Sequence, residues 1–315
     1  AGHPVYDKLA KEVKAPMICA NVVKEGTKDP YFPPYAIVTR QGVKIAVLGL
    51  TEPKITEQLP KAFWEGMDVL DMVETAKYWV PKIMAEEKPD VLVGLFHAGV
   101  DYTYGGQTAD TPGNESASQL VVERVPGFDF IFVGHDHAGW EGKGYDPATK
   151  SKNVDVKDPS GKVVPIYGAL AGAQNAAVVD VELQWDKKAK AWNKKVSGSL
   201  VPLKGVAADP AFLAKFEPAK AELMAWVERP IGKMVGKINS DEAMFGDSAF
   251  VDLIHRIQLE LCADPTMGLK PAQISFAAPL DQYAYLPTTT DGTIKVRDMF
   301  RSEEHTSELQ SRITI

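Results

Sequence analysis

The stretch Gly127-Phe-Asp-Phe-Ile-Phe-Val-Gly-His-Asp-His137 joins a continuous apolar run to a short turn that contains two histidines. The run 128–133 predicts a strand that is covered on both faces. His135 and His137 follow it directly, after Gly134, which permits a tight backbone turn. A Gly-His-Asp-His turn at the end of a buried strand favours ligand binding over a purely structural role.

A third histidine stands in a comparable place, because His97 directly follows the apolar run 91–96. Ligands of layered α/β folds bind outside the carboxyl ends of the strands, so two neighbouring strands would bring these imidazoles to one edge. In an extended chain His135 and His137 would point to the same side, about 6.5–7 Å apart, and could each address one of two metal ions. Taken alone, His97 fits a surface or hydrogen-bonded residue slightly better than a ligand.

The polar residues near these histidines are expected to play lesser roles. In extended geometry Asp136 points away from its two neighbours, which predicts that it supports them or lies in solvent. Asp101 and Asp110 stand in a polar loop after His97, where they either edge the site or, as is more common, are solvated. His3 and His255 are interpreted as structural.

The residues before His97 predict strands and one helix. Residues 16–22 predict a short buried strand, and 35–39 with 43–50 predict a hairpin that turns at Gln41-Gly42. Residues 71–88 predict an amphipathic helix that begins with a capping box of Asp71 and Glu74. Pro81 lies inside that pattern and predicts a kink or an early end.

The residues after His97 continue the alternation of helices and strands, which predicts an α/β layered core. A helix is predicted from Asn114, as its N-cap, to about Val125. Residues 141–162 are polar and predict a long surface loop. Residues 163–203 alternate in hydropathy and predict antiparallel strands, which indicates a mixed sheet or a two-sheet sandwich.

The chain is predicted to hold two domains joined by a helix. The first covers 1–206, and a helical linker at 207–230 opens at Asp209-Pro210. The second, 231–300, begins an α/β unit with a strand at 273–277 and a helix from Asp247-Ser248, whose predicted buried residues are Leu253, Ile254, Ile257 and Leu261.

The two ends of the chain have unusual sequences. The chain opens on Ala-Gly-His-Pro without a methionine, so we expect the first domain to lack its N-terminal part. Residues 301–315 show no apolar periodicity and resemble a translated sequencing adapter, so this stretch, with His305, is set aside.

Composition limits the classes of function. The chain has 315 residues, 45% of them hydrophobic, and a formal net charge of -7, which is ordinary for a globular protein and argues against a nucleic-acid polymer as partner. No run of about 18 apolar residues predicts a membrane span. Its 2 cysteines support neither a disulfide framework nor a cysteine-based zinc site.

Four segments together resemble one known family. They are Ala20-Asn-Val22, Val47-Leu-Gly-Leu-Thr51, Val93-Gly-Leu-Phe-His-Ala-Gly99 and the stretch 127–137. They resemble the calcineurin-like metallophosphoesterases, in particular the branch of 5'-nucleotidases and 2',3'-cyclic-nucleotide 2'-phosphodiesterases. The resemblance spans most of residues 1–300. It implies an α/β fold, namely an incomplete layered mixed-sheet sandwich, followed by the start of a C-terminal substrate-binding domain.

The resemblance also implies a metal site and a substrate site. His97 and His135 would bind one divalent ion and His137 a second, each of them Mn, Zn, Fe, Co or Mg. The family's other ligands lie in Asp-x-His, Gly-Asp and Gly-Asn-His motifs, and none of these stands upstream of His97. The last motif carries the catalytic histidine, so we expect no catalytic residue here and an inactive fragment. Asp281 and Tyr283 are candidate substrate contacts, although the stretch around them departs from the family's Asn-Gly-Gly pattern.

The implied partner is a small nucleotide or another phosphate ester, in a periplasmic or secreted protein. Three alternatives stay open at this point. The substrate is a nucleotide monoester; it is a related ester, such as a cyclic nucleotide, a UDP-sugar or a thiosulfate ester; or the chain is a non-catalytic module whose metal site has decayed.

Overall fold

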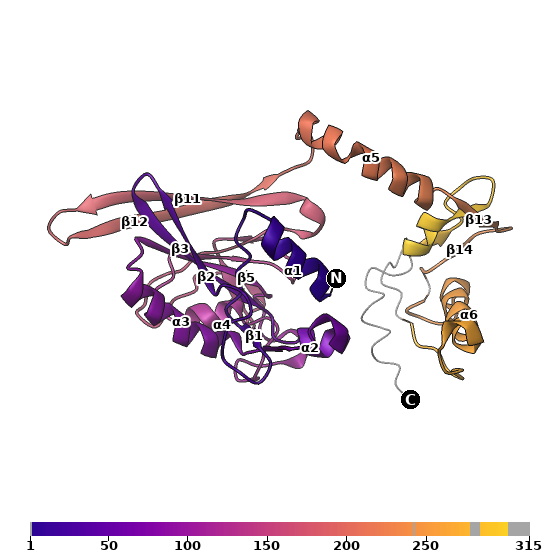
Figure 1. The fold of residues 1–315 in the computed structure, drawn as a ribbon, viewed down its shortest axis with the longest axis horizontal. Coiled ribbons are helices and arrows are strands. Elements are labelled where there is room, and N and C mark those ends of the chain that lie inside the picture. The colour runs from indigo at the N-terminus through magenta and orange to yellow at the C-terminus, as the bar shows by residue number, and fades with distance from the viewer. Residues whose placement is uncertain (1, 242, 278–283, 302–315) are drawn as a thin grey trace. The chain divides into compact units, whose positions relative to one another are not determined.

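The computed structural model describes residues 2–241, 243–277 and 284–301 (Figure 1). The chain divides after Val206 into two units, and each is treated by itself below. The candidate residues Asp281 and Tyr283, like nearly all of the segment 301–315, lie outside the described residues.

The first unit is built on a six-stranded mixed sheet in the order β2-β3-β5-β6-β10-β7. The four central strands run parallel, while β2 and β7 are antiparallel edge strands. The bounds are β2 Tyr35–Arg40, β3 Val43–Thr51, β5 Val91–His97, β6 Phe130–Val133, β10 Ile166–Gly168 and β7 Trp140–Glu141. The α/β mixed-sheet class predicted from the sequence is thereby confirmed.

The hairpin β2–β3 turns where the sequence predicts. Gln41 has φ of 50° and Gly42 has φ of 80°, and two consecutive positive values are characteristic of a type I′ turn. This turn matches the twist of the flanking strands, so it fixes the register that pairs Arg40 with Val43. Strand β3 pairs in turn with β5, and this pairing places Thr51 beside His97.

Two helices cover one face of this sheet. They are α3, Met72–Glu86, and α4, Ser118–Arg124, and both contribute to the main core. Asp71 caps α3 as predicted, because its side chain accepts a hydrogen bond from the backbone N–H of Glu74 at 3.0 Å. Of the two alternatives predicted at Pro81, a kink or an early end, the early end is wrong, since the helix continues for five more residues to Glu86.

A long antiparallel hairpin covers part of the opposite face. It consists of β11, Asn175–Asp186, and β12, Ala191–Pro202, and its apolar residues pack on Val91, Val93 and Phe130. Within 163–203 the prediction of antiparallel strands is confirmed for this hairpin, whereas β10 pairs antiparallel with β7 and parallel with β6. The next residue of β5 on this face, Leu95, keeps 49% of its surface exposed.

Three local predictions in this unit are wrong. The strand expected at 16–22 is shifted to β1, Val22–Lys24, although Ala20 is already buried. Asn114 does not cap a helix, because its side chain instead bonds to the loop at Tyr102 and Thr108, and α4 starts later. The predicted loop 141–162 contains the paired strands β8, Gly144–Asp146, and β9, Ser151–Val154.

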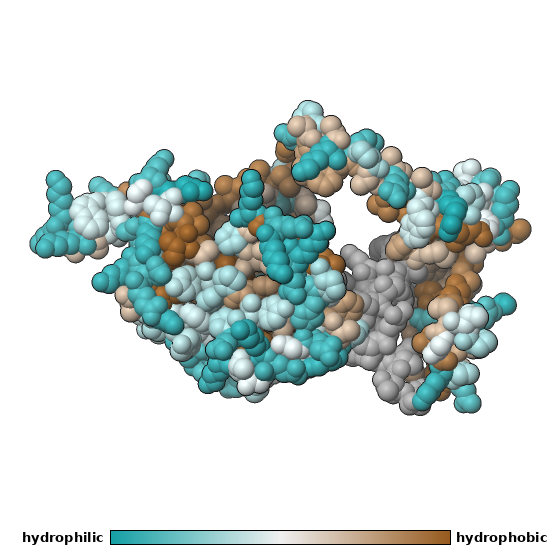
Figure 2. Space-filling model, viewed as in Figure 1, coloured by the Kyte–Doolittle hydropathy of each residue, from teal (hydrophilic) through white to brown (hydrophobic). Residues whose placement is uncertain are grey.

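The remaining elements of the first unit are short. They are helix α1 His3–Glu12, helix α2 Ile55–Gln58, strand β4 Met67–Val69, and the 3-10 turns Lys61–Phe63, Tyr104–Gly106 and Ala171–Ala173. Strand β4 pairs with β1 in a separate two-stranded sheet. On the side seen in Figure 2, α1 and α3 carry mainly hydrophilic residues, as expected of helices that face water.

The second unit begins with α5, Pro210–Val227, which Asp209 caps as predicted through the backbone N–H of Phe212. Figure 2 shows hydrophobic and hydrophilic residues mixed over this helix. Its other elements are β13 Pro230–Lys233, β14 Ile238–Asn239, α6 Ala249–Ala263, the turn Pro265–Met267, β15 Tyr285–Leu286, β16 Thr293–Lys295 and the turn Val296–Arg301.

The small core of the second unit differs from the predicted one. Phe250 is its largest buried side chain, with Leu253 and Ile254 packed against it. The predicted burial of Ile257 and Leu261 is wrong, because they keep 40% and 43% of their surface exposed. The strand expected at 273–277 does not form, since no ladder partner pairs with this segment in the described residues.

None of the helices in the described residues is both long and apolar enough to span a bilayer.

Candidate metal centre

Two of the three predicted ligands meet at the edge where the parallel strands end. Strands β5 and β6 are neighbours, and their register pairs Phe96 with Val133, which sets His97 level with Gly134. The next residue, His135, presents its ring to that of His97. The two ring centroids lie 5.5 Å apart in an edge-on arrangement, with 70° between the planes.

The backbone around His135 differs from the extended chain expected from the sequence. His135 has φ of 76° and His137 has φ of 55°, so both lie in the left-handed region. Residues other than glycine adopt this region rarely and at a cost of about 1–3 kcal/mol. The prediction of an extended chain with both rings on one side is therefore wrong. A bend presents the histidines instead.

The third predicted ligand, His137, is exposed. Within the described parts of the chain, no three His, Cys, Asp or Glu side chains are grouped closely enough to hold one ion. The imidazoles of His97 and His135 fit part of a metal site, because nitrogen ligands suit zinc and other transition ions and the two rings approach each other.

The electrostatics of the site favour the metal-binding form of His97. Partial burial lowers the pKa of its imidazole, and the neighbouring His135 and His137 lower it further by charge repulsion. A lowered pKa keeps the ring neutral to more acidic pH, and only neutral imidazole binds a metal ion.

A buried carboxyl group lies next to this edge. Glu52 is 2% exposed, and its backbone N–H donates to the carbonyl of His97 at 2.9 Å. Burial raises its pKa to about 7, although a hydrogen bond from the backbone N–H of Lys54 opposes the shift. The sequence does not predict the burial of Glu52, because nothing in Thr-Glu-Pro distinguishes a buried glutamate from an exposed one.

An apolar hollow of about 640 Å³ adjoins the histidine edge. His97, Gly134 and Leu95 line it on the sheet side, and α1 contributes Tyr6. The other walls are mostly aromatic and aliphatic, including Phe32, Phe63, Trp64, Met67 and Phe132. The hollow lies on the part of the sheet face that the hairpin β11–β12 leaves uncovered.

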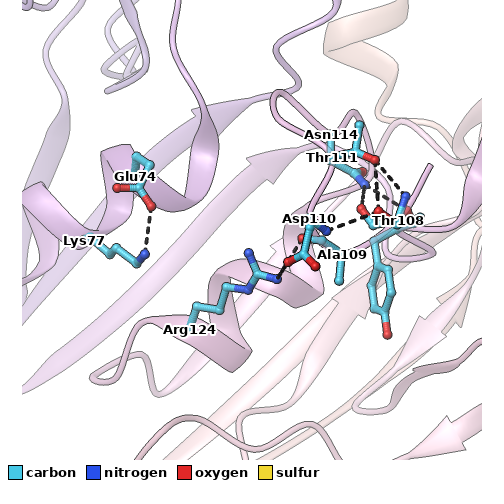
Figure 3. A network of polar contacts seen from close by, with 9 residues as sticks. Glu74, Lys77, Thr108, Ala109, Asp110, Thr111, Asn114 and Arg124 are labelled. Atoms are coloured by element: carbon cyan, nitrogen blue, oxygen red, sulfur yellow. Dashed lines mark hydrogen bonds and ion pairs between the residues drawn. The ribbon is translucent and has the colours of Figure 1, made fainter.

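The loop after His97 is tied to α4 and does not reach the histidines through Asp110. Figure 3 shows Arg124 donating to the carbonyl of Ala109 at 2.7 Å and to the carboxylate of Asp110 at 3.2 Å. Asp101 accepts from the backbone N–H and hydroxyl of Thr103 within the same loop. Both carboxylates are occupied in holding the loop.

The two histidines interpreted as structural each contact a hydroxyl group within their own unit. A ring nitrogen of His3 lies 3.2 Å from the hydroxyl of Tyr31, and one of His255 lies 2.9 Å from that of Ser275.

Comparison with known proteins supports the assignment of the fold. No family model matches the chain. A Haemophilus influenzae protein named 2',3'-cyclic-nucleotide 2'-phosphodiesterase/3'-nucleotidase is 30% identical over 267 residues, which cover 79% of this chain. The chain spans only 38% of that protein's length. The crystal structure of the calcineurin-like phosphoesterase YfkN from Bacillus subtilis matches 72% of this chain and 68% of its own, with a TM-score of 0.59 and 22% identity.

The chain has the fold of the calcineurin-like phosphoesterases. A second solved structure, a putative 5'-nucleotidase from Staphylococcus aureus, extends the likeness to 96% of this chain and 53% of its own. Its TM-score is 0.68 at 15% identity. The calcineurin-like fold therefore accounts for the layered sheet and for the edge at which the histidines gather.

Within this calcineurin-like fold, the sequence predicts the three histidines as candidate ligands but does not predict the contacts that hold their turn. The carboxylate of Asp136, expected to support its neighbours or lie in solvent, accepts three hydrogen bonds from Val100, Ala138 and Trp140. Two of these donors lie close in sequence, but Val100 belongs to the loop after His97. Only the pairing of β5 with β6 brings it near.

Proposed function

We propose that the protein containing this chain hydrolyses phosphate esters of nucleotides with the help of two divalent ions. His97 and His135 would hold one ion and His137 the second. The observation that carries the proposal is the 5.5 Å approach of the His97 and His135 rings at the carboxyl ends of adjacent parallel strands. The relatives named for nucleotide hydrolysis point the same way.

The charge of the chain is consistent with this chemistry. A formal net charge of -7 gives an anionic phosphate ester no general attraction, so the positive charge at the site must be local. Divalent ions, when bound, polarise the phosphoryl oxygens and lower the pKa of a bound water enough for it to attack. The lowered pKa of His97 keeps one imidazole ready to bind metal at neutral pH and below.

Cyclic nucleotides are a second candidate substrate class, because the Haemophilus influenzae relative is named as a cyclic-nucleotide phosphodiesterase as well as a nucleotidase. We also propose that residues 1–315 are inactive alone, since no Asp-x-His or Gly-Asn-His motif stands upstream of His97 to complete the ligand set. Export from the cytoplasm is proposed as well, since one solved relative is described as a 5'-nucleotidase precursor.

The test uses the full-length protein. Bound metal is measured by mass spectrometry, and hydrolysis is followed on 5'-AMP, 3'-AMP, 2',3'-cyclic AMP, UDP-glucose and a thiosulfate ester. We expect bound Mn, Zn, Fe, Co or Mg, with turnover that His135→Ala abolishes and His255→Ala leaves unchanged. A protein that holds none of these metals after purification and cannot be loaded with any would refute the proposal.

A further inference from the structure

The side chain of Asp136 joins the two loops that carry the histidines. Its Oδ2 atom accepts from the backbone N–H of Val100 at 3.1 Å and from the indole N–H of Trp140 at 3.0 Å. Its Oδ1 atom accepts from the backbone N–H of Ala138 at 3.1 Å. Both partners on Oδ2 are buried, since Val100 is 0% and Trp140 2% exposed. Water therefore competes poorly for these bonds.

The hydrogen bonds of Asp136 hold a bend whose backbone conformation is unfavourable by itself. His135 and His137, on either side of Asp136, both have positive φ, which persists only where surrounding contacts hold it. The backbone N–H of Asp136 donates to the carbonyl of Gly134 at 3.0 Å, and the carboxylate closes the other side of the bend through Ala138. The aspartate thus stabilises the conformation that presents both rings.

The carboxylate of Asp136 also links the bend of His135 and His137 to the loop after His97. That loop is held by Ser118 of α4. The backbone N–H of Ser118 donates to the carbonyl of Gly99 at 3.1 Å, and its hydroxyl donates to the carbonyl of Ala98 at 2.9 Å. Gly99 packs closely on Asp136: a Cβ at Gly99 would lie 3.2 Å from that of Asp136. The bond to Val100 therefore ties the bend to a rigid support.

We propose that Asp136 is a positioning residue, which locks the bend of His135 and His137 against the loop of His97 so that the imidazoles are arranged for metal binding. This inference rests on the function proposed above and adds a residue that does not itself touch the ion. Hydrogen-bonded supports of this kind typically contribute 10–100-fold to metal affinity.

The experiment compares Asp136→Asn with the wild-type chain by titration with Co²⁺, following its visible absorption bands. Asparagine keeps the shape but replaces one acceptor oxygen with an NH₂ group, which must face the N–H donors. We expect the dissociation constant for Co²⁺ to rise about 10–100-fold and the absorption bands to shift. The matched control is Asp101→Asn, which removes the same charge from the loop after His97 and should leave both unchanged.

A second measurement tests whether Asp136→Asn lowers the Co²⁺ affinity only because it destabilises the fold. The urea midpoints of Asp136→Asn and Asp101→Asn are compared, and we expect the loss of Co²⁺ affinity to persist at urea-free conditions where both variants are fully folded. Trp140→Phe, which removes one of the three donors and keeps the carboxylate, provides a milder variant and should show a smaller loss of affinity than Asp136→Asn.

The outcomes distinguish this inference from the proposed function. If His97→Ala abolishes Co²⁺ binding while Asp136→Asn and Trp140→Phe bind it as tightly as wild type, the positioning role is wrong and the metal site stands. If the wild-type chain binds no Co²⁺, both the metal site and the positioning role are overturned.

Discussion

The buried carboxyl of Glu52 predicts that the stability of the first unit falls as the solution becomes alkaline. Its pKa is raised from 4.5 to about 7, mainly because burial disfavours the charged form. A group whose pKa is raised on folding stabilises the fold fully below its unfolded pKa. This contribution is lost as the pH rises through the folded pKa. The stabilisation by Glu52 is therefore expected to be lost between pH 4.5 and about 7.

The size of the effect follows from the same values. Each pKa unit is worth about 1.36 kcal/mol, so the wild-type chain should lose up to roughly 3 kcal/mol across this window relative to a variant that does not titrate. Glu52→Gln is that variant, since its amide oxygen can still accept from the backbone N–H of Lys54. It should therefore be the more stable protein at pH 8.

Urea unfolding followed by tryptophan fluorescence at several pH values between 4.5 and 8 measures the difference. Glu57→Gln serves as the control, because Glu57 lies on the same segment and is exposed. We expect the wild-type and Glu57→Gln curves to fall together with rising pH while Glu52→Gln stays above them. Parallel pH profiles for all three proteins would show that Glu52 does not take up a proton on folding.

Two further substitutions test the core beneath the histidine edge. Gly94→Ala should destabilise the first unit by about 1–3 kcal/mol in urea unfolding, because the added Cβ would lie 2.6 Å from a methyl of Ile131; an unchanged midpoint would show that β5 can shift. Asp129→Ala should cost about 1–3 kcal/mol, because Asp129 is 1% exposed and accepts from the backbone N–H of Leu92 as well as pairing with Lys162. An Asp129→Ala protein that unfolds at the same urea concentration as wild type would contradict that role.

The parts of the fold that sequence predicts are those set by local chemistry. Gln41-Gly42 specifies a turn by its own backbone preferences, and Asp71 caps a helix with a neighbour three residues away. The apolar runs before His97 and Gly134 identify buried strands without reference to their partners.

The parts that it misses depend on distant partners. The strands in 141–162 read as a loop because their residues are polar, yet β8 is held in place by the side chain of Gln119 on α4, which accepts from the backbone N–H of Tyr145. The positive φ of His135 and His137 is likewise not predicted by the sequence, because the hydrogen bonds of Asp136 that hold it reach a loop brought in by β5.

Calorimetric titration of the chain with Zn²⁺ at neutral pH measures whether His97 and His135 share one divalent ion. We expect a site whose affinity for Zn²⁺ falls at least about tenfold in His97→Ala and in His135→Ala, since each removes one nitrogen ligand, but not in His255→Ala. Equal affinity in the wild-type chain and all three variants would contradict it.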